Sequence, residues 1–130
     1  MKPLLYPYQS QTFTLGSELI ANVYDYEKGR KGSYRLEHTE HSRIRTSQRG
    51  IDDSLIPYVL DFGNHFLRQG YSFYVIAKNH LPQQMPFWLK EKLNNLVVVM
   101  GGDSNKIITC YKSSNAMRHI KKKLKYLLKG

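Results

Sequence analysis

Residues 37–51 read EHTEHSRIRTSQRGI, a stretch in which His41, Arg45 and Arg49 recur every fourth residue. On an α-helix this spacing places the three side chains in one stripe about 80° wide. Ahead of its last two residues the stretch holds a single sizeable apolar side chain, so such a helix has little to bury. We therefore predict a polar helix over residues 37–49, whose cations face either carboxylates of the fold or a phosphate group of a ligand.

The chain as a whole is strongly basic. Its 130 residues contain 20 Lys and Arg against 10 Asp and Glu, which gives a formal net charge of +10. Such an excess indicates a polyanionic partner, with nucleic acid first and an anionic membrane surface second. The alternative is a basic protein whose charges are simply solvated. A hydrophobic fraction of 41% argues against disorder, and the length predicts one domain with a modest core.

The single cysteine and the N-terminal sequence allow a prediction of the cellular compartment. Cys110 is the only cysteine, so we expect neither a disulfide framework nor a cysteine metal cluster. The N-terminal sequence MKPLLYPYQ lacks the apolar run of a signal peptide, and no segment approaches transmembrane length. These features predict a cytoplasmic protein with no transmembrane segment.

The first 36 residues allow two interpretations. Ser17 is placed to cap a short helix whose apolar residues have helical spacing, namely Leu19, Ile20, Val23 and Tyr24. Residues 11–15 fit a strand equally well. Residues 28–32, KGRKG, are expected to form a basic, flexible loop.

The pattern is clearer from residue 54 onward. We expect, in order, a helix over residues 54–62 capped by Ser54, a hairpin over residues 66–77 that turns at Gly70, a short helix over residues 86–93, paired strands over residues 96–100 and 106–111, and a last helix from Asn115. Phe87, Trp88 and Leu93 are the expected packing residues of the short helix. The predicted fold class is α+β: two N-terminal helices packed on a mostly antiparallel sheet of about four strands, followed by a C-terminal basic amphipathic helix.

Two motifs resemble a widespread bacterial family of small domains of unknown function that are often linked to toxins. The first is His41-x-x-x-Arg45-x-x-x-Arg49-Gly50-Ile51, and the second is a strand pair, LVVVM and then, after a turn, IITCY over residues 107–111. The fold of that family is thought to be related to the barnase, EndoU, colicin and RelE-like ribonucleases. The resemblance covers about residues 38–112 and implies a family-like core over residues 37–112 of a single domain. Residues 1–36 would be an N-terminal extension of uncertain structure, and the sequence pattern itself predicts the basic helix over residues 113–130.

Metal-independent cleavage of RNA needs a base for the 2′-hydroxyl, cations for the crowded phosphorane and an acid for the leaving oxygen. His41 suits the first or the last role, because histidine titrates near neutral pH. Arg45 and Arg49 suit the middle role, since a planar guanidinium holds two phosphate oxygens and stays charged. Thr109 and Tyr111 alternate to one side of their strand, where Thr109 would hold a phosphate and Tyr111 would stack a base or donate a proton. These five residues are the predicted catalytic set.

The same residues also fit structural roles. Arg45 and Arg49 would then pair with carboxylates of the fold, and His41 would pack as an ordinary interface histidine. The carboxylates nearest in the sequence are Glu37, Asp52 and Asp53. Thr109 is equally well explained by the preference of threonine for strands.

Metal binding is a separate alternative, because His38 and His41 are three residues apart and would share one helix face. The sequence has no HExxH motif and no second cysteine, and no obvious third ligand stands out among His65, His80 and His119. We therefore predict neither a metal nor another cofactor.

Cationic residues cluster again at the C-terminal end. The predicted nucleic-acid-binding residues are Lys112, Arg118, Lys121, Lys122, Lys123 and Lys125, which would contact the phosphate backbone. A core helix with a solvated basic face and an interfacial membrane helix are the alternatives. Together these observations predict a small toxin-type endoribonuclease acting on RNA. The alternatives are a non-catalytic nucleic-acid-binding module and a protein that binds an acidic antitoxin or immunity protein.

Overall fold

The computed structural model describes residues 8–25, 29–77 and 81–114. Its elements are β1 (Tyr8–Leu15), β2 (Glu18–Asp25), β3 (Arg30–His38), α1 (Glu40–Gln48), the 3₁₀ helix η1 (Asp53–Leu55), α2 (Ile56–Phe62), β4 (Asn64–Arg68), β5 (Tyr71–Val75), α3 (Phe87–Leu93), β6 (Leu96–Gly101) and β7 (Lys106–Lys112). The strands form one mixed sheet in the order β1-β2-β3-β7-β6-β5-β4, in which β3 and β7 are parallel and all other neighbours antiparallel. The predicted fold class is therefore wrong, because three strands, not two helices, open the described chain and the sheet has seven strands.

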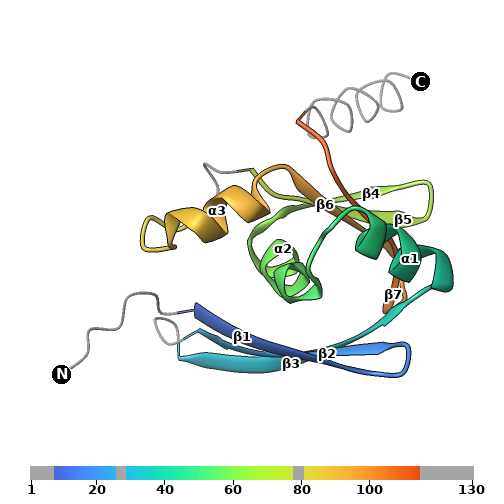
Figure 1. Ribbon diagram of the computed structural model, residues 1–130, viewed down its shortest axis with the longest axis horizontal. Coiled ribbons are helices and arrows are strands. Elements are labelled where there is room, and N and C mark those ends of the chain that lie inside the picture. Colours follow the sequence, from blue (N-terminus) through green and yellow to red (C-terminus); the bar gives the residue numbers. More distant parts are fainter. Residues whose placement is uncertain (1–7, 26–28, 78–80, 115–130) are drawn as a thin grey trace.

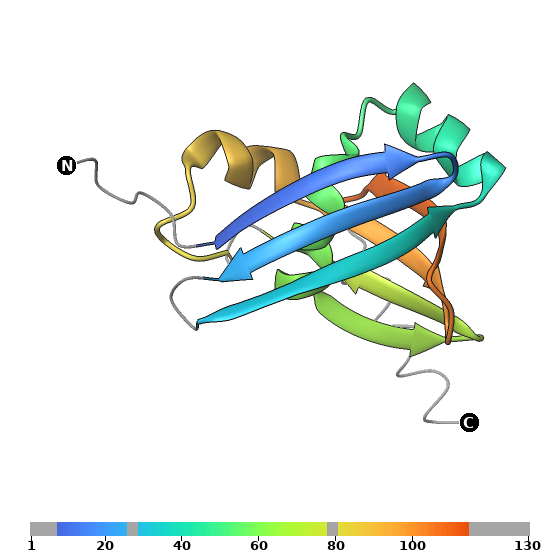
Figure 2. The same ribbon diagram turned by 90° about the horizontal axis from the view of Figure 1, so that it is seen from below.

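The sheet folds over at the junction of β3 and β7, so that its two halves face each other (Figure 1). β1, β2 and β3 form one half, β4 to β7 form the other, and α2 lies between them. Seen from below, the first three strands cross in front of the helices (Figure 2). The main core occupies this interior and takes side chains from both halves and from the helices, among them Leu19, Leu36, Ile56, Val59, Leu93, Val98 and Ile107.

A two-residue period explains why the chain opens with strands. In β2, Leu19, Ala21 and Val23 are buried while the residues between them are partly exposed. This is the pattern of a strand that rests one face on a core. The helix predicted after Ser17 is wrong, because only Leu19 and Val23 of the residues that suggested it lie on the buried face, and Ile20 and Tyr24 lie on the opposite face of the strand. The alternative strand over residues 11–15 is confirmed as part of β1.

The loop predicted over residues 28–32 is wrong in its second part. Arg30, Lys31 and Gly32 belong to β3, where they pair with the end of β2. Their side chains are exposed, so they read as a loop in composition. The ladder of backbone hydrogen bonds to β2 makes them a strand, and that pairing partner is not visible in the local sequence.

Both helices predicted in the middle of the chain are confirmed, with shifted starts. α1 begins at Glu40 because β3 runs on further than expected, and Thr39 caps it by accepting a hydrogen bond of 3.0 Å from the backbone N–H of Ser42. η1 and α2 together form the second helical segment. Its cap is Asp52 rather than Ser54, since the Asp52 carboxylate accepts a hydrogen bond of 2.9 Å from the backbone N–H of Ser54.

The hairpin of β4 and β5 and the strand pair of β6 and β7 are confirmed. Gln69 and Gly70 have φ angles of 52° and 80°, the left-handed conformation that a two-residue hairpin turn requires. Gly63, after α2, has a different reason to be glycine. A Cβ there would lie 2.5 Å from the carbonyl oxygen of Val59, so no larger residue fits between α2 and β5 without a shift of the backbone.

α3 is confirmed as an element, but two of its three expected packing residues are not. Phe87 and Trp88 are 68% and 61% exposed, and the core side of the helix is made by Leu89 and Leu93. The predicted helix from Asn115 lies outside the described residues. Within those residues, no helix is long and apolar enough to span a membrane.

Candidate functional site

α1 packs against the edge of β7. β3 pairs with β7 only through Glu37 opposite Lys106 and His38 opposite Ile107. Beyond that point α1 lies along β7, and the backbone N–H of Thr39 donates to the carbonyl of Ile107 at 3.2 Å. The break in pairing leaves the second half of β7 with an edge that side chains of α1 can reach.

The inward face of α1 is polar but buried. Ser42 and Thr46, four residues apart, are 0% and 3% exposed. The Ser42 hydroxyl lies 2.8 Å from Nδ1 of His38, and Nε2 of His38 lies 2.9 Å from Oδ1 of Asp53. The helix therefore does bury a face, made of small hydroxyl residues. The i, i+4 spacing of a serine and a threonine is the sequence signal for this face, which a pattern of large apolar residues does not reveal.

This arrangement bears on the proposed pairing of His38 with His41 around a metal. Both ring nitrogens of His38 have partners inside the fold, and the ring is 6% exposed. His41, in contrast, has an exposed side chain. Within the described residues, no group of three or more His, Cys, Asp or Glu side chains is placed to hold a metal ion. His38 is thus a structural residue that joins β3, α1 and η1.

The cationic row of α1 is exposed along its whole length. His41, Arg45 and Arg49 each present an exposed side chain, as expected of a helix face turned to solvent or to a ligand. Arg49, the last of the three, also reaches β7. Its Nη1 donates to Oγ1 of Thr109 at 3.1 Å and to the carbonyl of Cys110 at 2.7 Å. Two of the five predicted catalytic residues are therefore in contact, and the partners of Arg49 are these β7 groups rather than the expected carboxylates.

Thr109 and Tyr111 share one face of β7, as their alternation predicted, because they stand opposite Val99 and Val97 of β6. Tyr111 is half-buried and packs against the smaller cluster of Val75, Val97 and Val99. Burial raises the pKa of the Tyr111 phenol, and the positive charge of Arg49 acts in the lowering direction. The phenol is therefore protonated at neutral pH and able to donate a hydrogen bond.

A pocket of about 190 Å³ adjoins Arg49 at the end of α1. Its lining comes from the loop after α1 and from η1, α3, β6 and β7: Arg49, Gly50, Ile51, Asp52, Leu55, Lys92, Leu96 and Lys112. Lys112 is one of the predicted nucleic-acid-binding residues. Lys92 is not, because the sequence pattern predicts α3 only as a packing helix. The remaining predicted binding residues, Arg118, Lys121, Lys122, Lys123 and Lys125, lie outside the described residues.

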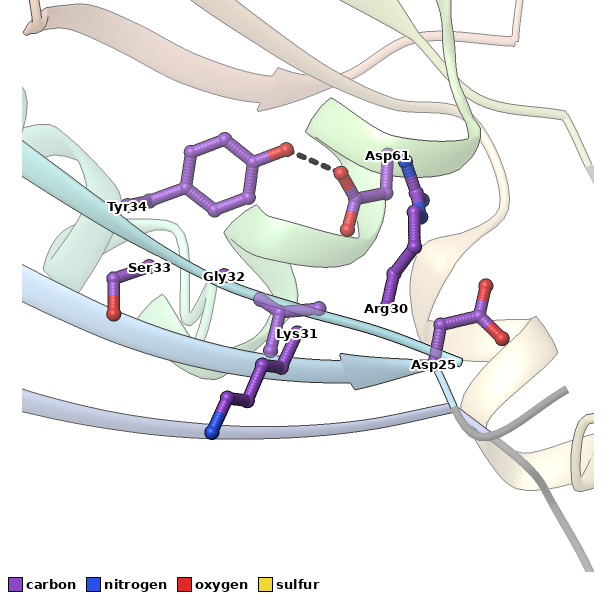
Figure 3. A pocket seen from close by; sticks show the side chains of 8 residues that line it. Asp25, Arg30, Lys31, Gly32, Ser33, Tyr34 and Asp61 are labelled. Atoms are coloured by element: carbon purple, nitrogen blue, oxygen red, sulfur yellow. Dashed lines mark hydrogen bonds between the residues drawn. The ribbon is translucent and has the colours of Figure 1, made fainter. Parts of the chain in front are cut away.

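A second cavity, of about 170 Å³, lies between the end of β2, the start of β3 and α2 (Figure 3). The hydroxyls of Tyr8 and Tyr34 both donate to the carboxylate of Asp61, which ties β1 and β3 to α2. Burial, followed by these bonds to Asp61, raises the pKa of both phenols. Arg30 and Lys31 are also among the lining residues. Because its charges are mixed and its hydrogen bonds are satisfied, we assign this cluster a structural role in joining β1 and β3 to α2. No local sequence pattern predicts it.

Comparison with protein-family models, with curated proteins and with solved structures finds no match for this chain.

Proposed function

We propose that this chain is a small, metal-independent endoribonuclease of the toxin type, acting in the cytoplasm on RNA held along α1. The observation that carries the proposal is the contact of Arg49 with Thr109 and Cys110, which fixes one end of an exposed cationic row on the sheet. A guanidinium held in place by the protein meets a phosphate without first losing conformational freedom. Arg45 and His41 continue the row away from this anchor.

The chemistry follows from the groups present. A base removes the proton of the ribose 2′-hydroxyl, whose oxygen then attacks the adjacent phosphorus. The bond from phosphorus to the 5′-oxygen breaks, an acid protonates that oxygen, and a 2′,3′-cyclic phosphate remains. We assign one of the two proton transfers to His41 and the phosphorane charge to Arg45 and Arg49. Tyr111, whose phenol is protonated at neutral pH, is the candidate donor for the other transfer.

A second candidate function is RNA binding without cleavage. One observation favours it: Nη1 of Arg49 already donates to two groups of the fold, and the Thr109 hydroxyl already accepts one of these hydrogen bonds. A site built only for affinity tolerates such occupied groups, because the guanidinium keeps its charge and further N–H groups. The basic surface would then also suit an acidic antitoxin or immunity protein as a partner.

The test is cleavage of bulk cellular RNA by the purified chain, with excess EDTA in parallel. The ribonuclease proposal expects cleavage with and without EDTA. It also expects His41→Ala to abolish cleavage while RNA affinity changes by less than about tenfold, or 1.4 kcal/mol. His65→Ala is the matched control, because His65 is an exposed histidine that stacks on Tyr74 away from α1.

Each of the other outcomes has a defined meaning. Tight binding by a wild-type chain that cleaves nothing would support the binding module. Cleavage that survives in His41→Ala would move the chemistry to another residue. Loss of activity in EDTA would contradict the metal-independent mechanism.

A further inference from the structure

α3 presents two neighbouring aromatic rings to the surface. Phe87 is 68% and Trp88 61% exposed, whereas Leu89 and Leu93 of the same helix are buried. Single exposed apolar residues are common on protein surfaces and need no explanation. Two large, exposed rings at consecutive positions of a short helix present more apolar surface than a single exposed residue does.

Lys92 connects these rings to the pocket at the end of α1. It follows Trp88 by one helical turn, and its Nζ lies 5.7 Å from the centre of a Trp88 ring. The same side chain lines the pocket together with Arg49 and Lys112. An aromatic face and a cationic cavity therefore meet at one residue.

Two of the three cations of the pocket, Arg49 and Lys112, donate to backbone carbonyls. Arg49 donates to the carbonyl of Cys110 at 2.7 Å, and Nζ of Lys112 donates to the carbonyl of Glu91 at 3.2 Å. In the described part of the chain, no salt bridge joins Arg49, Lys92 or Lys112 to a carboxylate. These bonds fix the positions of the charges without neutralising them, so the attraction for an anion is kept.

The pocket has the charge and size of a phosphate site with an apolar wall. Three cations and the single carboxylate of Asp52 leave a net charge of +2, and that carboxylate also accepts a hydrogen bond from Ser54. Ile51, Leu55 and Leu96 supply the apolar lining. A volume of about 190 Å³ is below the roughly 300 Å³ at which pockets begin to hold drug-sized ligands. It therefore suits a phosphate with part of its sugar, but not a whole larger ligand.

We propose that this surface binds single-stranded RNA, with one phosphate in the pocket of Arg49, Lys92 and Lys112 and a neighbouring base stacked on Trp88. Unpaired bases stack on exposed aromatic side chains, while the backbone follows a line of cations. This inference rests on the proposed function in taking RNA as the ligand, and it names the form of RNA and the residues that hold it. It also gives a role to the segment between β5 and β6.

Trp88 is the only tryptophan in the chain, so its fluorescence reports directly on the proposed contact. The experiment uses the His41→Ala chain, which the proposed mechanism makes unable to cut, and an octamer of uridylate labelled for anisotropy. Binding should quench Trp88, and inorganic phosphate should displace the octamer by competing for the pocket. Trp88→Ala should raise Kd at least about fivefold, and Trp88→Phe should restore part of the loss.

Charge variants separate the pocket from general attraction. Lys92→Gln and Lys112→Gln should each weaken octamer binding, whereas Lys106→Gln should not. Lys106 is the matched control, because it is exposed on the same strand as Lys112 but at its opposite end. A double-stranded RNA of the same length should bind more weakly than the octamer, since its bases are not available for stacking.

The inference is overturned if Trp88→Ala binds the octamer as tightly as the parent chain, or if Lys106→Gln weakens binding as much as Lys112→Gln. The proposed function fails separately. A wild-type chain that binds the octamer through Trp88 but never cleaves RNA would refute the ribonuclease and leave this surface intact. If the wild-type chain cleaves RNA and Trp88→Ala leaves the affinity for the octamer unchanged, the proposed ribonuclease stands and the proposed binding surface is refuted.

Discussion

Arg49 donates a hydrogen bond of 3.1 Å to the hydroxyl of Thr109, sixty positions further along the chain. The same Nη1 donates to the carbonyl of Cys110 at 2.7 Å. That carbonyl belongs to the part of β7 that β3 no longer pairs with, so the guanidinium satisfies an edge group that would otherwise need water. The bond locks α1 to the sheet and places the positive charge of Arg49 beside Tyr111 and the cationic pocket.

The first prediction separates the two arginines of the cationic row, Arg45 and Arg49. Arg49→Ala removes two hydrogen bonds from a charged donor, and we expect the free energy of unfolding to fall by about 1–2 kcal/mol. Arg45 is exposed in the same row, and Arg45→Ala should change stability by no more than about 0.5 kcal/mol. Urea unfolding of both variants measures the difference. Equal losses would mean that the contact with Thr109 contributes nothing, and a loss of 3 kcal/mol or more would indicate a buried ion pair.

From α1 onward, local sequence patterns were sufficient to predict the helices and strands of the described chain. The positive φ that Gly70 allows and the apolar run of residues 96–100 predicted β4 to β7 in nearly the right places. The same patterns failed for the strands before α1. In β2 the large apolar residues have helical spacing, whereas the buried residues follow the two-residue period of a strand. Its buried residues include Ala21, which is too small to mark the two-residue pattern in a hydropathy reading. The pairing of β3 with β7 spans about half the chain, and no local pattern encodes it.

Part of the candidate site could likewise be predicted from local spacing, and part depends on tertiary packing. The row from His41 to Arg49 is visible as a spacing, and the alternation of β7 correctly placed Thr109 and Tyr111 on one face. The place of Lys92 in the pocket could not be predicted from the sequence, because it depends on where α3 packs and not on any spacing along the chain. Tertiary packing also decides which face of α3 is buried, so Trp88 was assigned to the core although it is exposed.

The second prediction concerns the two neighbouring histidines. His38→Ala should lower the free energy of unfolding by about 2–4 kcal/mol, because it opens a cavity and leaves Ser42 and Asp53 without their shared partner. His41→Ala should change stability by about 0.5 kcal/mol at most, since its side chain is exposed. Thermal unfolding of both variants checks this. A large loss in His41→Ala would show that its ring packs in the fold and would weaken its assignment to proton transfer.

The third prediction is a loss of stability at alkaline pH. Burial raises the pKa of the Cys110 thiol from 9.0 to about 12. Burial and bonding to Asp61 raise the pKa of the Tyr8 and Tyr34 phenols above their ordinary value of 10. Above these ordinary values the unfolded chain releases protons that the folded chain keeps, so stability falls as pH rises. Each such group contributes a slope of about 1.4 kcal/mol per pH unit between its unfolded and folded pKa.

Urea unfolding at pH 7, 9 and 10.5 tests this dependence. Stability should hold from pH 7 to 9 with respect to these groups and drop at 10.5. Cys110→Ala and Tyr34→Phe should each flatten the alkaline part of the curve, because each removes one group that titrates differently in the two states. An alkaline slope that both variants leave unchanged would show that neither group is shifted by the fold.

The last prediction uses salt to decide which cations meet RNA. Each phosphate neutralised on a single strand contributes about 0.7 to the slope of log affinity against log salt. If the pocket holds a phosphate, Lys112→Gln should reduce the slope by about that amount, and the Lys106→Gln control should leave it unchanged. Replacing Lys121, Lys122 and Lys123 together by alanine should reduce it by about 2 if those residues also contact the backbone. An unchanged slope in Lys112→Gln removes the pocket from the RNA-binding surface, and an unchanged slope in the triple variant removes the C-terminal lysines. Because the two sets are independent, the pattern of losses shows whether RNA lies across α1 and α3, along the C-terminal segment, or across both.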